Sequence, residues 1–389
     1  MRNRHRIRFL PMDRTFYGSR DESVLEVAMR SGVHINAGCG GTGACGRCKI
    51  TVSSGDVFSS PSSLLSSEER EAGVRLACMT YPLGDITVTI PLESQIDRTA
   101  LKRSGRGKQV LSVSGAESLV KGWKLSPSIV KKHLRLRPPT LDDNGSDAGR
   151  LLLELRRQTG IDAFLEFDLL PVLSGLVRQA DWDVTVTVGE SPQGWTVLNI
   201  EPGNRDDKNY AVAVDLGTTT VCTELLDFSV AAAGHGPARD RRIEGRVKAE
   251  SADYNGQISY GEDVISRIMY AQKPNGLKRL QEAAVATINR LIGEMTDHAG
   301  VDTNDLTQVV LAGNTTMMHL LLRLPPGNIA VSPFIPVTTQ LCKVKARELG
   351  IGINPHGYAV VLPSVSAYIG ADTIAAILSS GLYSSRKTT

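Results

Sequence analysis

Four of the six cysteines in this 389-residue chain have the spacing of an iron-sulfur cluster site. Cys39, Cys45 and Cys48 form a C-x5-C-x2-C run, and Cys78 follows at long range. Five glycines stand within or beside this run, between residues 38 and 46. Four thiolates offset much of the charge of two ferric ions, and glycines let main-chain N–H groups approach the sulfur atoms. The pattern therefore predicts a [2Fe-2S] cluster bound by these cysteines.

Other uses of four cysteines must be compared with this one. A structural zinc site usually combines two short C-x-x-C pairs, and here only Cys45 and Cys48 are placed in that way. A disulfide framework needs an oxidising compartment, and the sequence shows no secretory segment. Residues 38–43 also fit G-x-G-x-x-G, but they follow a predicted helix rather than a strand, which argues against a dinucleotide site. Zinc is the alternative that stays open.

The segments around the cysteines predict a small sheet with one helix. Residues 6–10 and 86–90 alternate in a way that is typical of half-buried strands. Ser23 and Glu26 have the spacing of a capping box at the start of a helix. This arrangement resembles the β-grasp fold of [2Fe-2S] ferredoxins over residues 1–92, and the x5 spacing is closer to the adrenodoxin and putidaredoxin type than to the plant type.

The composition excludes some classes of function. There are 44 basic and 41 acidic residues, a net charge of +3, and only 5% aromatic residues, so we expect no nucleic-acid partner. No run of about 18 apolar residues occurs, so we expect no membrane partner and a cytoplasmic protein. Outside the cluster set, Cys222 and Cys342 are predicted to be buried, reduced thiols.

The length allows two or three domains. Residues 93–125 are basic and contain Gly and Ser, which indicates a linker. Residues 126–206 combine helix-like apolar spacing around Leu173 with an alternating Val/Thr segment and a turn before Trp195, which predicts a small α+β middle domain with a hairpin. This domain shows no catalytic pattern, so we assign it an interaction role and regard a homodimer as an open alternative.

Residues 207–389 begin with a motif that is typical of phosphate sites. An apolar strand over residues 211–214 ends at Asp215, and a second strand runs to residue 226. Between them stand Gly217, Thr218, Thr219 and Thr220. An aspartate at a strand end, followed by a glycine turn and hydroxyl groups, can hold a magnesium-bound water and surround phosphate oxygens. We therefore predict ATP and Mg²⁺ as possible ligands here.

Three further segments place polar groups at strand ends or helix starts, where anions bind well. Residues 260–267 are predicted to open a helix. Residues 309–317 have a strand-turn-helix pattern around Gly313 and Asn314. Residues 362–372 lead into a last helix. Together with the Asp215 motif, these segments predict an α/β nucleotide lobe.

The strand-D-x-G-T-T-T-strand motif and the segments after it resemble the first lobe of the acetate and sugar kinase, heat-shock chaperone and actin superfamily, which has a ribonuclease H-like ATPase fold. With the cysteine domain ahead of it, the whole chain is similar to the reductive activators of corrinoid proteins. This resemblance implies ATP-dependent reduction of cobalt(II) to cobalt(I) in a corrinoid protein of a methyltransferase system, with electrons from an external low-potential donor. It also implies that Asp215 positions magnesium and water, and that residues 217–220 contact phosphates.

One part of the family pattern is not found. The resemblance implies a second lobe with another D-x-G turn and an adenosine motif, and neither follows Asp372. We therefore expect weak or undetectable ATP binding and no ATPase activity from these residues alone. An alternative is an electron-transfer and interaction protein with a vestigial nucleotide lobe. Sugar kinases have no use for the cysteines, and the activators of 2-hydroxyacyl-CoA dehydratases hold their cluster between subunits.

Overall fold

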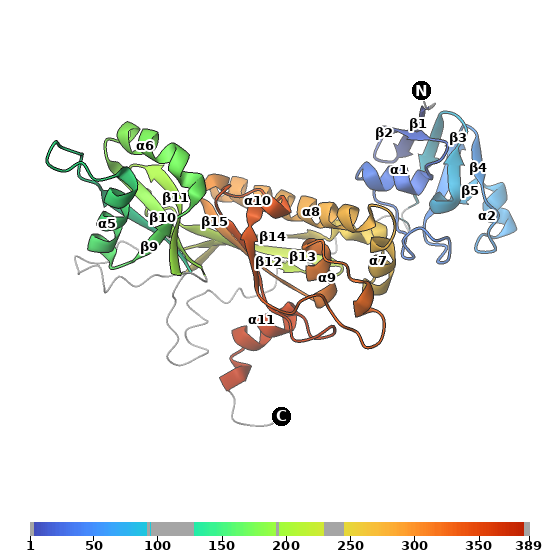
Figure 1. Ribbon diagram of the computed structural model, residues 1–389. Coiled ribbons are helices and arrows are strands. Elements are labelled where there is room, and N and C mark those ends of the chain that lie inside the picture. Colours follow the sequence, from blue (N-terminus) through green and yellow to red (C-terminus); the bar gives the residue numbers. More distant parts are fainter. Residues whose placement is uncertain (1–3, 92–93, 95–127, 192–193, 229–244, 385–389) are drawn as a thin grey trace.

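The structure is a computed structural model that describes residues 4–91, 94, 128–191, 194–228 and 245–384. Three successive sheets, each with its own buried core, follow one another along the chain (Figure 1). The predicted linker at residues 93–125 lies, except for Ser94, outside the described residues.

The first sheet has five strands in the order β2-β1-β7-β3-β5. Its strands are β1 (Arg4–Leu10), β2 (Arg14–Ser19), β3 (Lys49–Ser54), β5 (Val74–Leu76) and β7 (Ile86–Thr89). Beside it lie α1 (Val24–Arg30), α2 (Ser67–Glu71) and the pair β4 (Val57–Ser59) and β6 (Thr80–Pro82). Both predicted strands and the predicted helix are present. Ser23 Oγ accepts from the Glu26 N–H at 3.2 Å, and the Glu26 carboxylate accepts from the Ser23 N–H at 2.8 Å, so the predicted capping box is confirmed.

The second sheet has four strands in the order β8-β10-β11-β9. They are β8 (Ile129–Arg135), β9 (Ala163–Leu165), β10 (Asp183–Ser191) and β11 (Gly194–Pro202), and α5 (Asp147–Thr159) and α6 (Leu170–Gln179) pack against them. β10 and β11 pair antiparallel with Ser191 opposite Gly194, which confirms the predicted hairpin. The domain is α+β, as expected.

The third sheet has six strands in the order β14-β13-β12-β15-β17-β16. The strands are β12 (Tyr210–Leu216), β13 (Thr220–Asp227), β14 (Arg246–Tyr254), β15 (Leu306–Gly313), β16 (Cys342–Lys345) and β17 (Tyr358–Val361). The helices are α7 (Val264–Ala271), α8 (Gly276–Ala299), α9 (Thr315–Leu321), α10 (Ala346–Leu349) and α11 (Ala371–Ser379). Strands β12, β15 and β17 run parallel, so their carboxyl ends meet at one edge. β12 extends to Leu216, and the glycine turn begins after that residue rather than directly after Asp215.

Short 3-10 turns connect these elements. They are η1 (Ala77–Met79), η3 (Phe167–Leu169), η5 (Gly256–Tyr260), η6 (Thr303–Asp305), η7 (Gly327–Ile329) and η8 (Leu382–Ser384). Of these, η5 leads from β14 into α7. Within the described residues, no helix has the length and apolarity that a membrane crossing requires.

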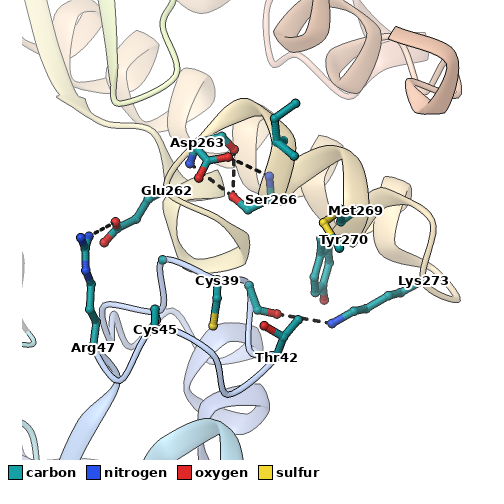
Figure 2. Close-up of a pocket in the computed structure, with 13 residues that line it drawn as sticks. Cys39, Thr42, Cys45, Arg47, Glu262, Asp263, Ser266, Met269, Tyr270 and Lys273 are labelled. Carbon is teal, nitrogen blue, oxygen red and sulfur yellow. Dashed lines mark hydrogen bonds and ion pairs between the residues drawn. The ribbon is translucent and has the colours of Figure 1, made fainter. Parts of the chain in front are cut away.

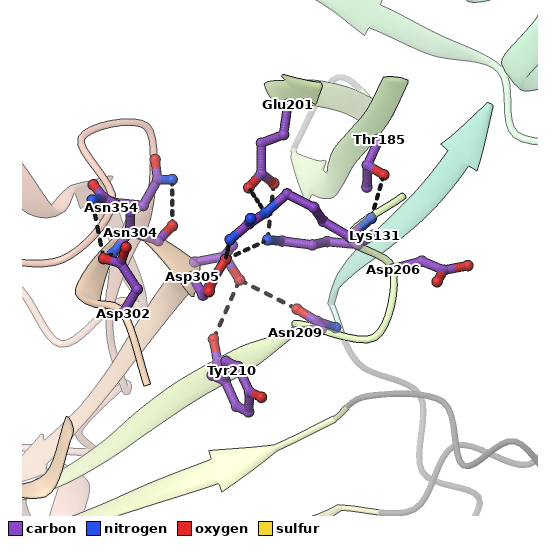
Figure 3. A network of polar contacts seen from close by, with 12 residues as sticks. Lys131, Thr185, Glu201, Asp206, Asn209, Tyr210, Asp302, Asn304, Asp305 and Asn354 are labelled. Carbon is purple, nitrogen blue, oxygen red and sulfur yellow. Dashed lines mark hydrogen bonds and ion pairs between the residues drawn. The ribbon is translucent and has the colours of Figure 1, made fainter. Parts of the chain in front are cut away.

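A buried polar network fastens the middle sheet to the third sheet (Figure 3). The Lys131 ammonium on β8 is fully buried and lies 2.8 Å from the Glu201 carboxylate and 3.4 Å from that of Asp305. Arg205 reaches the same two carboxylates at 3.0 and 2.7 Å. Because each buried charge has partners of opposite sign, this contact fixes the two sheets relative to each other.

The two cysteines outside the cluster set are less buried than predicted. Cys222 is exposed and Cys342 is half-buried, and neither forms a disulfide. Cys222 lies on β13 between the buried residues Val221 and Thr223, so the alternation of a strand turns its side chain to the other face of the sheet. Cys342 lies on the edge strand β16. The prediction of burial is therefore wrong for Cys222 and only partly right for Cys342.

Candidate cluster site and phosphate turn

The four predicted ligand cysteines come together as two pairs. The Sγ atoms of Cys48 and Cys78 lie 3.3 Å apart, and both side chains are buried. Cys39 and Cys45 are hydrogen-bonded to each other and are half-buried. Within the described part of the chain, no three potential ligands close around one metal ion. Two thiol pairs suit a cluster with two irons better than a single tetrahedral zinc, so the donor set fits a [2Fe-2S] group.

The loop that carries these cysteines depends on glycine. Gly40, Gly41, Gly43 and Gly46 have φ angles of 64°, 85°, 81° and 69°. Other residues adopt this left-handed region only at a cost. In the same loop, the N–H groups of Ala44 and Cys45 are hydrogen-bonded to the Cys39 sulfur.

These hydrogen bonds favour the thiolate that a metal needs. Burial opposes ionisation of Cys39, but hydrogen bonds from the side chains of Thr42 and Cys45 and from the main chain outweigh it and lower its pKa to about 6. In the inner pair, a shared hydrogen bond lowers the pKa of Cys48 and raises that of Cys78. Negative charge is therefore favoured on one sulfur of each pair, Cys39 and Cys48, while burial raises the pKa of Cys45.

The loop of residues 38–48, here called the cluster loop, docks against the beginning of α7. The domain of the first sheet and the domain of the third sheet form a cavity of about 640 Å³ there (Figure 2). Arg47 forms an ion pair with Glu262. Lys273 Nζ donates to the main-chain oxygen of Gly40 at 3.4 Å. Cys39 and Cys45, the two less buried cysteines, line this cavity together with residues of α7. The sequence did not indicate this contact.

Two glycines make the close approach possible. A Cβ atom on Gly38 would lie 2.7 Å from a carboxylate oxygen of Glu262. A Cβ atom on Gly40 would lie 2.6 Å from the main-chain oxygen of Tyr260. Real Cβ atoms do not come so close to other atoms. The Glu262 side chain could move away from a Cβ on Gly38, but the main-chain oxygen of Tyr260 could not move away from one on Gly40, so the close fit requires glycine above all at Gly40.

The predicted phosphate motif forms a compact turn, here called the phosphate turn (residues 217–220). Asp215 is exposed near the end of β12 and pairs with Ala312 of β15. The Gly217 N–H donates to the Thr220 oxygen at 3.0 Å, and a Cβ on Gly217 would lie 2.5 Å from that oxygen. Thr219 is exposed, while Thr218 and Thr220 are half-exposed. The turn therefore presents hydroxyl groups beside an accessible carboxylate.

The other predicted segments meet at the same edge of the sheet. Asn314 caps α9, and its Nδ2 atom donates to the Thr218 hydroxyl at 2.9 Å. Gly370, at the start of α11, lies so close to Asn314 that a Cβ would be 2.5 Å from the Asn314 Cα. A Cβ on Gly313 would likewise lie 2.5 Å from the main-chain oxygen of Leu216. The strand ends of β12 and β15 and the start of α11 thus surround one place.

Two buried residues that the sequence analysis did not single out hold the phosphate turn. The Asn255 N–H donates to the Thr219 oxygen and its Nδ2 to the Gly217 oxygen, both at 2.8 Å. Arg267 on α7 donates to the Thr218 oxygen at 2.6 Å and to the Gly261 oxygen at 2.8 Å. Arg267 is fully buried, and this burial lowers its pKa to about 10. A polar residue at a core position of a helix is the only signal in the sequence that could have drawn attention to Arg267.

Comparisons with known proteins agree with this domain order. The sequence model of the 2Fe-2S iron-sulfur cluster binding domain matches residues 8–83, that of the RACo linker region residues 118–207, and that of the RACo middle region residues 210–385. The predicted middle domain thus falls in what that family calls its linker region. A component of the Na(+)-translocating NADH-quinone reductase of Yersinia enterocolitica is 29% identical over 83 residues, which are 21% of this chain and 20% of that protein.

Two relatives match nearly the whole chain. The corrinoid activation enzyme RamQ from Eubacterium limosum is 26% identical over 362 residues, which are 92% of this chain and 53% of that protein. A solved structure of a reductive activator for corrinoid, iron-sulfur protein is 30% identical with a TM-score of 0.61, and the match covers 98% of this chain and 59% of that one. The chain thus spans between half and three fifths of the length of these relatives.

The fold and the cysteine loop define a mixed α/β multidomain protein that carries a [2Fe-2S] ferredoxin domain. The order of its domains and the two relatives that match over most of its length identify it more closely. The linker-region and middle-region models of the RACo family together match more than half of the chain, so the chain belongs to that family. The names of both long relatives refer to corrinoid activation, in agreement with the resemblance that the sequence motifs indicated.

Proposed function

We propose that this chain passes single electrons from a [2Fe-2S] cluster to a corrinoid protein of a methyltransferase system and returns cobalt(II) to cobalt(I). The observation that carries the proposal is the paired set Cys39–Cys45 and Cys48–Cys78 in a loop that packs directly against the lobe with the phosphate turn. The names of both long relatives, a corrinoid activation enzyme and a reductive activator for corrinoid, iron-sulfur protein, support the corrinoid as the electron acceptor.

The cysteine loop would hold the cluster and set how it exchanges electrons. When bound, the cluster supplies one electron at a time. The N–H groups that reach Cys39 stabilise charge on its sulfur, and the buried position of Cys48 and Cys78 limits the access of water. The half-buried pair Cys39 and Cys45 is the more accessible side for electron exchange.

The phosphate turn gives the reaction a source of free energy. An electron transfer that is uphill by 59 mV is tenfold less favourable, so a low-potential cobalt centre requires a second driving force. We assign ATP and Mg²⁺ to this turn, with Asp215 positioning the metal-bound water and Gly217 and Thr218 to Thr220 contacting phosphate oxygens. The meeting of Asn314 and Gly370 at the same sheet edge supports an anion site there. The assignment of this domain to the first lobe of an actin-like ATPase is part of the proposal.

The proposal also concerns partners. We infer that an external low-potential donor reloads the cluster, since no reductant is part of the chain's own chemistry. We also propose that the middle domain forms a homodimer contact, which a measurement of the mass in solution would test.

The test is the spectroscopic loss of cobalt(II) in a corrinoid protein, mixed with the full chain and a chemical reductant, with and without MgATP. We expect reduction by the wild type and by Cys222→Ser, a matched control outside the cluster set, and no reduction by Cys45→Ser. Equal rates for wild type and Cys45→Ser would contradict the proposal. If reduction requires Cys45 but has the same rate without MgATP and in the Asp215→Ala variant, the alternative is favoured. That alternative is an electron-transfer protein with a vestigial nucleotide lobe.

A further inference from the structure

Arg267 lies between the phosphate turn and the surface on which the cluster loop docks. Its Nη2 atom donates to the Thr218 oxygen at 2.6 Å, and its Nε atom donates to the Gly261 oxygen at 2.8 Å. The next residue, Glu262, forms the ion pair with Arg47 of the cluster loop. A continuous series of contacts therefore leads from the phosphate turn through Arg267 to the cluster loop.

The surroundings of Arg267 make this connection stiff. The side chain is fully buried, and its remaining hydrogen bonds go to Gln257 Oε1 at 3.2 Å and Met317 Sδ at 3.1 Å. All four hydrogen-bond partners are uncharged. A buried cation that loses one of these acceptors is costly, because no water replaces it. The Thr218 and Gly261 carbonyl groups are therefore held in fixed positions relative to each other.

The docking surface depends on the same short segment. Gly38 and Gly40 of the cluster loop press against Glu262 and the Tyr260 oxygen, the two residues that flank Gly261. A displacement of Gly261 moves both contact points at once. Since the fit leaves no room even for a Cβ atom, small displacements change how closely the loop can approach.

We propose that Arg267 is a positioning residue that couples the phosphate turn to the docking of the cluster loop. A ligand at the turn then changes how firmly the ferredoxin domain is held on α7, and the docked domain changes the turn. The coupling itself follows from the described contacts. It rests on the proposed function only in that the ligand is named as a nucleotide. In the reaction, it gives nucleotide a means to hold or release the cluster.

Coupling between two sites is reciprocal, which provides the test. A factor by which one site affects the other must appear in both directions, and common values are roughly 5- to 150-fold. Arg47→Gln removes the ion pair at the docking surface without touching the phosphate turn. Its side chain is 59% exposed, so the variant should fold. The matched control is Arg30→Gln, which removes an arginine paired with Glu22 inside the same domain.

Hydrogen exchange, measured by mass spectrometry on the full chain with its cluster bound, reports on both the phosphate turn and the cluster loop. The Gly217 and Asn255 amides report on the phosphate turn, since both donate to its carbonyl groups, and the Gly40 amide reports on the loop because it donates to the Ala37 oxygen. We expect Arg47→Gln to accelerate exchange at Gly40 and, by up to about fivefold, at Gly217 and Asn255. Arg30→Gln should leave Gly217 and Asn255 at the wild-type rate.

A second variant, Arg267→Gln, removes the residue in the middle of the series of contacts between the phosphate turn and the cluster loop. In this variant we expect faster exchange at the loop, and the addition of Arg47→Gln should then have no further effect at the turn. If Arg47→Gln accelerates exchange at Gly40 but leaves Gly217 and Asn255 unchanged, the coupling is refuted, whether or not Arg267→Gln folds. If MgATP leaves exchange at the turn unchanged, the nucleotide assignment fails, and the response to Arg47→Gln still decides the coupling.

Discussion

Arg47, between the second and third cysteines of the cluster loop, forms an ion pair with Glu262 at the start of α7, although 215 positions separate them in the sequence. Their side chains are 59% and 28% exposed, and an ion pair at such a site contributes about 0 to 1 kcal/mol. The docking of the two domains therefore depends more on the close fit at Gly38 and Gly40 than on this charge pair.

The first prediction concerns the cluster. The protein purified without oxygen should contain two irons and two labile sulfides per chain, because four thiolates in two pairs provide the complete ligand set. Cys45→Ser should lose the cluster, and Cys222→Ser should keep it. Metal analysis and the visible absorption of thiolate-bound iron are the measurements. One zinc per chain and no iron would show that the alternative metal is the correct one.

The second prediction separates the fit at the docking surface from backbone strain. Gly40 and Gly32 have nearly equal φ angles, 64° and 65°, but only a Cβ on Gly40 would meet the other domain. Alanine at either position should cost about 1 to 2 kcal/mol because of the left-handed backbone. Gly40→Ala should in addition release the ferredoxin domain and increase the radius of gyration in small-angle scattering. Equal radii for both variants would mean that Gly40 is not needed for docking.

The third prediction tests the network between the middle sheet and the third sheet. Lys131→Met removes one of the two cations that face the Glu201 and Asp305 carboxylates and leaves only Arg205, which should cost roughly 1.5 to 3 kcal/mol. Lys278→Met on α8 is the matched control, since Lys278 is 59% exposed and its ion pair with Glu282 contributes little. Urea unfolding of both variants measures the difference. A loss of less than about 1 kcal/mol for Lys131→Met would show that the network is dispensable.

Local patterns in the sequence were sufficient for the elements that carry the chemistry. The capping box of Ser23 and Glu26, the hairpin after β10 and the strand that leads to Asp215 are each determined by residues close in the chain. The spacing of Cys39, Cys45 and Cys48 predicted a ligand loop for the same reason, whereas Cys78 lies 30 positions beyond Cys48. Such features depend on hydrogen bonds and alternation within a few residues, which a single sequence displays directly.

Contacts between distant segments could not be predicted in this way. Nothing near Arg47 in the sequence specifies Glu262, and nothing near Thr218 specifies Arg267. The exposure of Cys222 also depends on which face of β13 the helix α8 covers. These features are decided by the packing of whole elements, and for that reason sequence analysis found the segments of the site but not the residues that join them.

The last prediction concerns pH and His319 on α9. Its Nδ1 atom lies 2.7 Å from the Thr315 oxygen, and its Nε2 atom accepts from the Val337 N–H at 2.9 Å, so the neutral ring satisfies both partners. Burial lowers the pKa of His319 below its usual 6.5, although the hydrogen bond to Thr315 opposes this. Because the unfolded chain then takes up a proton more readily than the folded one, this residue's contribution to stability is complete above pH 6.5 and is lost as the pH falls toward the folded pKa.

His319→Gln keeps an acceptor for the Val337 N–H but cannot be protonated in this range. Between about pH 7.5 and pH 5.5, the wild type should therefore lose more of its unfolding free energy than His319→Gln does. The comparison of the two proteins removes the contribution of other groups, such as His356, whose pKa burial also lowers. Parallel losses in the two proteins would mean that His319 titrates as it does in the unfolded chain, and the hydrogen bond to Val337 would then not require the neutral ring.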